Sequence, residues 1–261
     1  MGRRVIVIAV LPLLSIGFFF CAGCRPKAPA TPATPAIAVT AQRPDGAILF
    51  QTYFQYDFKK DGMGGAGFFI RTPEGKNAAV IAASSVKADM PALVSVNAVN
   101  IGDYAPLAVM AQSWGEPGRP GKFEPTPDYQ HDYIVMPIGE MAIERTLQLD
   151  DRAGPVQGEP VWFPFMTEHE PRGYLWMDGV VDEVWPGYIR VRIDSTKTVR
   201  SQEGAPIVSG TTGKVIGIVA RAGKIQQKTV LWLCPADSIR QGMKKAKSFP
   251  MLKDVVRGGG A

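Results

Sequence analysis

Cysteine and histidine are scarce in this sequence, with three and two copies among 261 residues. Two of the cysteines, Cys21 and Cys24, lie in one short segment, so the chain lacks the cysteines that a disulfide framework needs. The remaining Cys234 and the two distant histidines, His131 and His169, do not have the spacing of a metal site. We therefore expect no bound metal and no cofactor, and we expect Cys234 to be a buried, inert thiol.

Other absences narrow the class of protein. Glycine shows no period of three, no heptad repeat persists, and only one long apolar run occurs, which excludes a collagen-like chain, a coiled coil and a polytopic membrane protein. Apolar residues make up 46% of the chain, which excludes disorder over most of its length. The formal net charge is +5 and the basic residues are scattered, so we expect no nucleic-acid partner.

The one long apolar run lies at the beginning of the chain. Two arginines precede an apolar segment, residues 5–20, and the sequence CAGC follows at positions 21–24. This order is typical of a secretory signal peptide, so residues 1–23 are left out of fold reasoning and the rest of the chain is expected outside the cytoplasm. Loss of the two arginines lowers the formal charge of +5 by two, to +3.

The end of this segment resembles a bacterial lipoprotein signal, in which cleavage precedes a cysteine that then carries lipid. The resemblance implies that Cys24 is lipidated and attaches the chain to a membrane of the bacterial cell envelope, facing the periplasm or the exterior. Cys21 stands where these signals usually have leucine. The less favoured alternative is an uncleaved transmembrane anchor over residues 5–23. Arg25 is not the acidic residue that some bacteria use as an inner-membrane retention cue, which favours the outer membrane.

A linker, a domain and a tail follow the signal. Residues 24–44 are rich in proline, alanine and threonine, and four prolines recur at every third position from 26 to 35. This is the period of a polyproline II helix, which rises about 3.1 Å per residue, so we expect a stiff tether from the membrane. The folded domain is expected over residues 45–250, and residues 251–261 are expected to form a flexible tail.

The domain consists of short segments rich in Val, Ile, Phe, Tyr and Trp, separated by Gly, Pro, Asp and Asn. We expect twelve strands, at 48–58, 67–70, 78–83, 92–99, 107–112, 133–137, 160–165, 175–184, 188–193, 206–208, 215–220 and 230–234. Only residues 236–247 have a helical pattern, with Ile239 and Met243 four positions apart. The glycine-rich residues 62–67 are interpreted as a mobile turn, because no Lys-Ser or Lys-Thr pair and no helix follows them. The sequence therefore predicts an all-β barrel or sandwich with a terminal helix.

Three separated motifs carry a resemblance to a known family. The first is GAGFFI at 65–70 with VIAASSV at 80–86, the second is HDYIVMPI at 131–138, and the third is SQEGAPIV at 201–208 with GKVIGI at 213–218. In this order they resemble the trypsin-like (chymotrypsin-fold) serine proteases, particularly their bacterial periplasmic branch. The resemblance spans about residues 42–248. It implies a chymotrypsin-like double β-barrel with a C-terminal helix and a cleft between the barrels.

The resemblance places the catalytic triad at Ser85, Asp132 and Glu203, which are separated by 47 and 71 residues. Ser85, or Ser84 if the alignment shifts by one, stands where the family has histidine, and Glu203 stands where it has the nucleophilic serine. Only Asp132 keeps the family's residue. Because a serine nucleophile needs an imidazole to take its proton, the triad is expected to be degenerate.

The loop that would stabilise the oxyanion also departs from the family's pattern. Its positions are Ser201, Gln202 and Gly204; Ser201 replaces a glycine, and Ala205 replaces the second glycine after the nucleophile position. A side chain at residue 201 restricts the backbone angles that turn N–H groups towards a substrate.

Neither histidine is expected to rescue the triad. His131 adjoins Asp132 in one strand and should leave on the opposite face, and His169 lies in a charged surface loop.

These features favour a lipid-anchored pseudoprotease of the cell envelope that binds an extended peptide or an envelope protein and does not cleave it. Recognition by strand addition uses main-chain hydrogen bonds and needs no triad. The alternative is an active hydrolase, either serine-protease-like or based on the carboxylates Asp132 and Glu203, since two adjacent carboxylates can perform acid-base chemistry.

Overall fold

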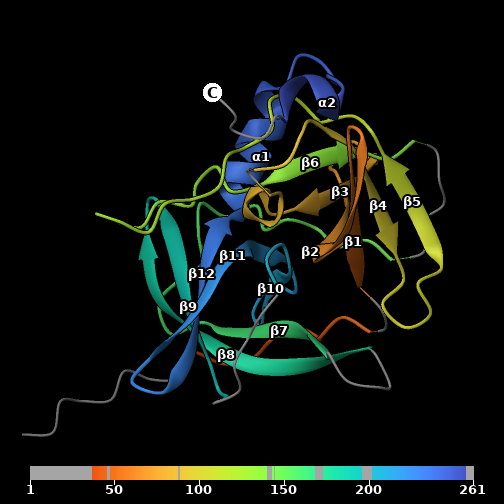
Figure 1. Cartoon of the computed structure of the whole chain (residues 1–261). Coiled ribbons are helices and arrows are strands. Elements are labelled where there is room, and N and C mark those ends of the chain that lie inside the picture. Colours follow the sequence, from red (N-terminus) through yellow and green to blue (C-terminus); the bar gives the residue numbers. More distant parts are fainter. Residues whose placement is uncertain are drawn as a thin grey trace, which may run out of the picture. The chain divides into compact units, whose positions relative to one another are not determined.

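The computed structural model describes residues 37–45, 48–87, 89–139, 143, 145–167, 173–195 and 202–256, with the backbone alone at residues 59–61 (Figure 1). The signal segment, Cys24, His169 and Ser201 lie outside these residues. Within them, no helix combines the length and the apolar character that crossing a bilayer requires.

Six antiparallel strands form the first sheet, in the order β5-β4-β1-β2-β3-β6. Their bounds are β1 Leu49–Tyr56, β2 Lys59–Arg71, β3 Asn77–Ile81, β4 Leu93–Val99, β5 Pro106–Met110 and β6 Ile134–Pro137. Alternate residues of β1 are buried, as expected for a strand with one face on a core. The sheet curls into a half-barrel, drawn in orange to yellow-green in Figure 1.

The second six strands close into a barrel, in the order β10-β11-β12-β9-β8-β7. Their bounds are β7 Pro160–Thr167, β8 Gly173–Trp185, β9 Tyr188–Ile193, β10 Pro206–Ser209, β11 Val215–Ile225 and β12 Lys228–Pro235. β9 and β12 form part of the barrel wall and are buried along most of their length. Closure gives each of the six strands two neighbours, although β10 pairs with only part of β11.

The two sheets share one hydrophobic core. Phe68 and Val80 of the first sheet belong to the same buried cluster as Ile207 and Ile218 of the second. A separate cluster fills the half-barrel, where the rings of Phe50 and Phe69 lie 4.6 Å apart. The shared core fixes the first sheet against the second, and the ends of β3, β6 and β10 therefore meet at the junction of the two.

The glycine-rich segment 62–67 is part of β2, so its interpretation as a mobile turn was wrong. A Cβ atom on Gly64 would lie 2.1 Å from the Phe54 ring, and one on Gly67 would lie 2.3 Å from the Phe50 ring. The glycines make room for aromatic rings of the neighbouring strand, which is a packing role that a strand can require.

Two helices follow the barrels. α1 (Ala236–Lys245) lies where a helix was expected, with Ile239 fully buried and two lysines in its last turn. α2 (Leu252–Val255) lies in the segment expected to be a flexible tail, so that expectation was wrong for residues 251–256. Leu252 is fully buried, its N–H donates to the carbonyl of Ala111 at 2.8 Å, and Leu93 N–H donates to Val256 at 3.0 Å. A buried leucine and two backbone hydrogen bonds thus hold α2 and the residue after it against the half-barrel.

The C-terminal part of the expected linker is also attached to the domain. The N–H groups of Thr40 and Ala41 both donate to the carbonyl of Gly210, at 3.0 and 2.9 Å, and the Thr40 hydroxyl donates to Thr211. Arg43 lies over the Trp176 ring at 5.9 Å. The linker boundary at residue 44 is therefore corrected, since residues 40–43 pack on the second barrel.

Candidate functional site

Asp132 lies at the junction of the two sheets, two residues before β6, and it is fully buried. Its Oδ1 accepts the Ser84 N–H at 2.7 Å, and its Oδ2 accepts the Gly121 N–H at 3.2 Å. Burial raises the pKa of the Asp132 carboxyl, and these two backbone hydrogen bonds only partly oppose the rise. Each oxygen of this acid therefore accepts one N–H group of the chain's own backbone.

The two serines at the histidine position lie in a single 3-10 turn, η1 (Ala83–Ser85), directly after β3. Ser84 holds Asp132 through its backbone, and its hydroxyl donates to the carbonyl of Ala220 at 3.3 Å. The Ser85 hydroxyl donates to the carbonyl of Ala82 at 2.5 Å. Both hydroxyl protons are directed to main-chain carbonyls, and neither residue offers a base of suitable pKa.

Glu203 lies beside the same turn, and its side chain is half-buried. Its carbonyl accepts the N–H of Ala66 in β2 at 2.8 Å. A Cβ atom on Gly65 would lie 2.3 Å from that carbonyl oxygen and 3.3 Å from the Ser85 Cβ. The structure therefore places Glu203 next to Ser85 across a glycine, and it places Asp132 against the neighbouring Ser84.

The loop before β10 is used to hold strands together. The buried Gln202 side chain accepts the Met166 N–H at 2.9 Å and donates to the Met166 carbonyl at 3.3 Å. Gly204 has φ +90°, and its N–H donates to Val219 at 2.7 Å. A Cβ atom there would lie 2.1 Å from the carbonyl oxygen of Ala66, so only glycine fits. The Gln202 amide and the Gly204 N–H are thus committed to β7 and β11 and do not point at a substrate.

A long loop between β5 and β6 covers the site, and the sequence analysis did not identify it. Gly121 of this loop donates to Asp132, and the Phe123 ring lies 5.4 Å from the Trp232 ring of β12. The Arg221 guanidinium lies over the Phe123 ring, 4.3 Å from the ring centroid. The density of glycine and proline in residues 115–127 signals an irregular loop, but no local pattern shows that it crosses to the second barrel.

The exposure of His131 and the burial of Cys234 agree with the sequence analysis. His131 is exposed while the adjacent Asp132 is buried, in agreement with side chains that leave on opposite faces. Cys234 is fully buried, and burial raises the pKa of its thiol well above the ordinary value. Among the described residues, no three His, Cys, Asp or Glu side chains form a group that could hold a metal ion.

A second polar cluster lies in the segment that leads into β7. The Arg152 guanidinium binds Asp150 at 2.6 Å and Glu159 at 2.8 Å, and both carboxylates are almost fully buried. Burial alone would raise the pKa of each carboxyl, but hydrogen bonds led by those from Arg152 outweigh it and hold both pKa values below the ordinary range. Thr212 donates to Asp150 at 3.0 Å and completes the cluster. It is a structural network, since one guanidinium binds both buried carboxylates.

A closed six-stranded barrel, a six-stranded half-barrel, a buried acid at their junction and a C-terminal helix together define the chymotrypsin-like fold of the serine proteases. A thermostable serine protease, AL20, from an extremophilic microorganism matches the chain with a TM-score of 0.54 and 10% identity, over 77% of this chain and 97% of that one. A protease from M. tuberculosis in its active form matches with a TM-score of 0.50 and 13% identity, over 84% and 94%.

The serine endoprotease from Yersinia pestis matches with a TM-score of 0.50 and 11% identity, over 76% of this chain. The chain spans 63% of that endoprotease, which is less than two thirds of its length. No protein-family model and no curated protein matches the chain. The likenesses establish the fold, and the chymotrypsin-like double barrel expected from the sequence is confirmed.

Proposed function

We propose that this chain is a pseudoprotease of the bacterial cell envelope, which uses a protease fold to bind a peptide or protein partner without cleaving it. The observation that carries the proposal is the chemistry beside Asp132. The turn that binds this buried acid presents the hydroxyls of Ser84 and Ser85, where a triad needs an imidazole.

The chemistry of the neighbouring positions supports the same proposal. Serine hydrolysis needs a nucleophilic hydroxyl and a base, but the chain has a carboxylate at residue 203 and a hydroxyl at residue 85. Removing one member of a triad typically lowers the rate by several orders of magnitude, and here two members are replaced.

Hydrolysis by Asp132 and Glu203 is the competing proposal, and the geometry favours it less. A carboxylate that activates water or protonates a leaving group needs an oxygen free to contact it. Both Asp132 oxygens are hydrogen-bonded inside the fold, and the side chain is fully buried.

Peptide binding by strand addition has a suitable edge next to these residues. β10 pairs with β11 only as far as Ile218, whereas β12 pairs with β11 on its other side up to Ile225. Within the described residues, the stretch 221–225 of β11 therefore has one side without a partner strand, beside the Ser84 contact at Ala220. An extended peptide could pair there by main-chain hydrogen bonds.

Anchoring through lipid on Cys24 is part of the proposal. A lipidated cysteine followed by the proline-rich residues 25–36 would hold the domain near a membrane surface and concentrate it there for membrane-bound partners.

Proteolysis is the direct test. The full chain, purified in a nonionic detergent, is incubated with unfolded casein and with a fluorophosphonate probe, and we expect neither cleavage nor labelling. If casein is cleaved, the variants Glu203→Gln and Glu74→Gln are compared, since Glu74 is an exposed carboxylate at the β2–β3 turn. Cleavage that Glu203→Gln abolishes and Glu74→Gln leaves unchanged would overturn the proposal in favour of carboxylate-based hydrolysis.

A further inference from the structure

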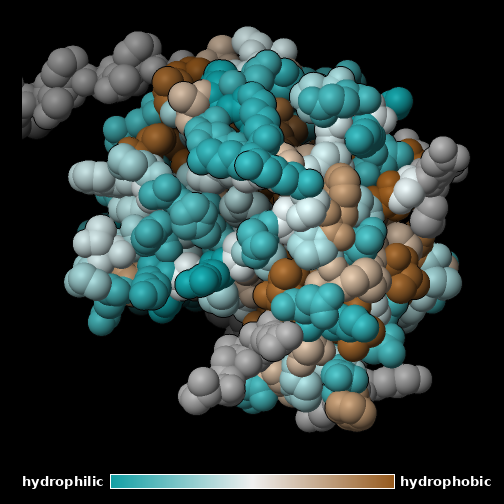
Figure 2. Space-filling model, turned by 90° about the horizontal axis from the view of Figure 1, so that it is seen from above, coloured by the Kyte–Doolittle hydropathy of each residue, from teal (hydrophilic) through white to brown (hydrophobic). Residues whose placement is uncertain are grey.

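A hollow lies on the face that carries α1. It has a volume of about 810 Å³ and runs between the β5–β6 loop and the end of α1. We call it the α1 groove and define it by residues 115–122, His131, Tyr133, Gly242 and 245–248. Figure 2 views this side of the molecule, where hydrophilic side chains cover much of the surface. His131 and Tyr133, the two chain neighbours of the buried Asp132, line the groove, and so does Gly121, which donates to Asp132, so the groove lies beside the junction of the barrels.

Backbone hydrogen bonds hold the walls of the α1 groove in place. Gly118 N–H donates to Tyr133 at 2.8 Å, Arg119 N–H donates to His131 at 2.7 Å, and Gly115 N–H donates to Ser248 at 3.0 Å. Gly242 of α1 lies so close to Tyr133 that a Cβ atom would stand 2.0 Å from the Tyr133 hydroxyl. The loop, the segment before β6 and α1 are thus joined directly, and the groove is formed before any ligand arrives.

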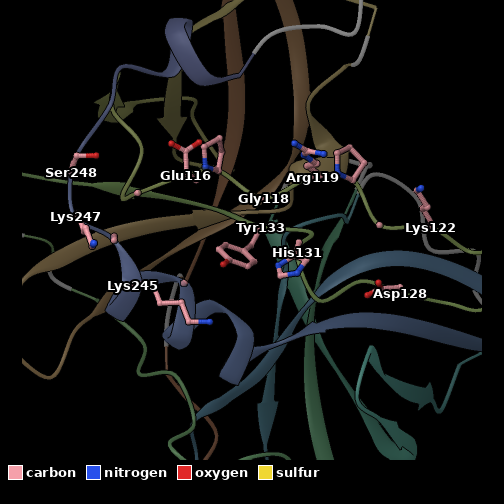
Figure 3. A pocket seen from close by; sticks show the side chains of 16 residues that line it. Glu116, Gly118, Arg119, Lys122, Asp128, His131, Tyr133, Lys245, Lys247 and Ser248 are labelled. Atoms are coloured by element: carbon pink, nitrogen blue, oxygen red, sulfur yellow. The ribbon is translucent and has the colours of Figure 1, made fainter.

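Cationic side chains stand on both sides of the α1 groove. Figure 3 shows Lys245 and Lys247 on the α1 side and Arg119 and Lys122 on the loop side, with Tyr133 and His131 between them. All four cations are exposed, and none forms an ion pair with a carboxylate in the part of the chain that the structure describes. Glu116 and Asp128 are the acidic residues of the lining, so the cations outnumber the carboxylates four to two.

This arrangement is complementary to an anionic ligand of mixed character. Unpaired cations on two opposite walls attract carboxylates, while Glu116 and Asp128 repel a chain that is uniformly anionic. The backbone of residues 115–121, with its prolines and glycines, and the Tyr133 ring supply less polar surface between the charges. A peptide with carboxylates spaced along it meets both conditions.

We propose that the α1 groove binds an acidic, extended segment of a protein partner, with carboxylates of that segment held between Lys245 and Lys247 on one wall and Arg119 and Lys122 on the other. The groove is a second binding surface, and its use does not depend on whether the junction of the barrels cleaves, binds or ignores peptides.

Fluorescence anisotropy tests the proposal on the full chain in a nonionic detergent. The probe is a fluorescein-labelled ten-residue peptide of alternating glutamate and glycine, and the comparison peptide has glutamine for each glutamate. We expect the glutamate peptide to bind at least about tenfold more tightly, and we expect added salt to weaken it, since exposed charges are screened. Equal affinity for the two peptides would overturn the proposal.

Charge-reversal variants locate the binding. The double variants Lys245→Glu/Lys247→Glu and Arg119→Glu/Lys122→Glu change one wall each, and we expect each to lose about tenfold in affinity for the glutamate peptide. The matched control Arg145→Glu/Lys228→Glu makes the same charge change at two exposed positions outside the groove and outside residues 221–225, and it should keep the affinity within about twofold.

Two outcomes would contradict this site. Equal losses in the control and the groove variants would show general attraction to a basic surface. The second outcome is displacement of the labelled peptide by micelles that contain phosphatidylglycerol. If the micelles displace it at a lower concentration of negative charge than the unlabelled glutamate peptide needs, the groove binds lipid headgroups in place of a protein segment. All the substituted residues are exposed, so circular dichroism of each variant should match that of the parent chain.

Discussion

Individual residues at the junction of the barrels make contacts that hold the fold together. Asp132 bonds the η1 turn and the β5–β6 loop, Gln202 clamps β7, and Gly204 lets β2 and β11 approach. The candidate site residues could be named from the motifs, because each lies in a short local pattern. Their hydrogen-bond partners could not, since Gly121 and Ala220 lie in segments that come together only through the tertiary fold.

Restoring the nucleophile alone should restore no activity. In Glu203→Ser the new hydroxyl would still lack a base, because both hydroxyls of η1 are bonded to carbonyl oxygens and Asp132 is held by backbone N–H groups. We expect fluorophosphonate labelling of Glu203→Ser to stay at the level of the parent chain and of the control Glu203→Ala. Rapid labelling of the serine variant only would mean that a base reaches residue 203.

The Arg152 network should respond strongly to loss of its cation. Arg152→Met leaves Asp150 and Glu159 buried without a counter-charge, and we expect the free energy of unfolding at pH 7 to fall by about 3 kcal/mol. The control Lys214→Met removes the partner of the exposed Asp151 and should cost about 0–1 kcal/mol. Urea unfolding of the two variants measures both values.

The same variant should show a defined pH dependence. In the parent chain the pKa values of Asp150 and Glu159 are lowered, so their contribution is present above the unfolded pKa values near 4 and is lost as the pH falls through the lower folded values. Without Arg152, burial raises both pKa values and the carboxyls take up protons at higher pH. We therefore expect the loss from Arg152→Met to shrink as the pH falls from 7 towards 5, and a constant loss would contradict the charge mechanism.

At the scale of the elements, the sequence predicted where strands lie better than where they end. All twelve strands and α1 were located, because runs of β-branched and aromatic residues between turn residues are a local signal. β2 begins at Lys59, eight residues before the expected start, since its glycines suit the packing of Phe50 and Phe54 and not a turn. α2 was missed, because four residues carry too little periodicity to identify a helix.

The short helix α2 should contribute to stability through one side chain. Leu252→Ala removes a fully buried side chain from the core of the half-barrel, and we expect the free energy of unfolding to fall by about 2–4 kcal/mol. Lys253→Ala, at the adjacent exposed position, should change it by less than about 0.5 kcal/mol. Equal effects in urea unfolding would show that the contact of α2 with the half-barrel does not hold in solution.

For the whole molecule, the double barrel could be predicted because three motifs, in the same order along the chain, resemble those of the trypsin-like serine proteases. The arrangement of the β5–β6 loop over the junction and of the α1 groove beside it could not, since both depend on contacts between residues far apart in the sequence. The proposed lipid anchor also belongs to this scale, since it would place the whole domain at a membrane.

Cys24→Ser should release the protein from the membrane. Serine cannot form the thioether to lipid that the resemblance to lipoprotein signals implies, so we expect the variant in the soluble fraction, or retained with an uncleaved signal at the inner membrane. Fractionation of the envelope distinguishes it from the control Cys21→Ser, which should behave like the parent chain. Unchanged outer-membrane association of Cys24→Ser would contradict lipidation at this residue.

The hydrogen bonds of Asp132 bear on how mutational data for this chain are interpreted. Replacing the aspartate breaks the tie between η1 and the β5–β6 loop and leaves two buried N–H groups without an acceptor, which is costly in any fold. A saturation scan scored by protein abundance would therefore find residue 132 intolerant of substitution while Ser85 and Glu203 accept many side chains. Intolerance at residue 132 would therefore report on folding, whether or not the chain catalyses a reaction.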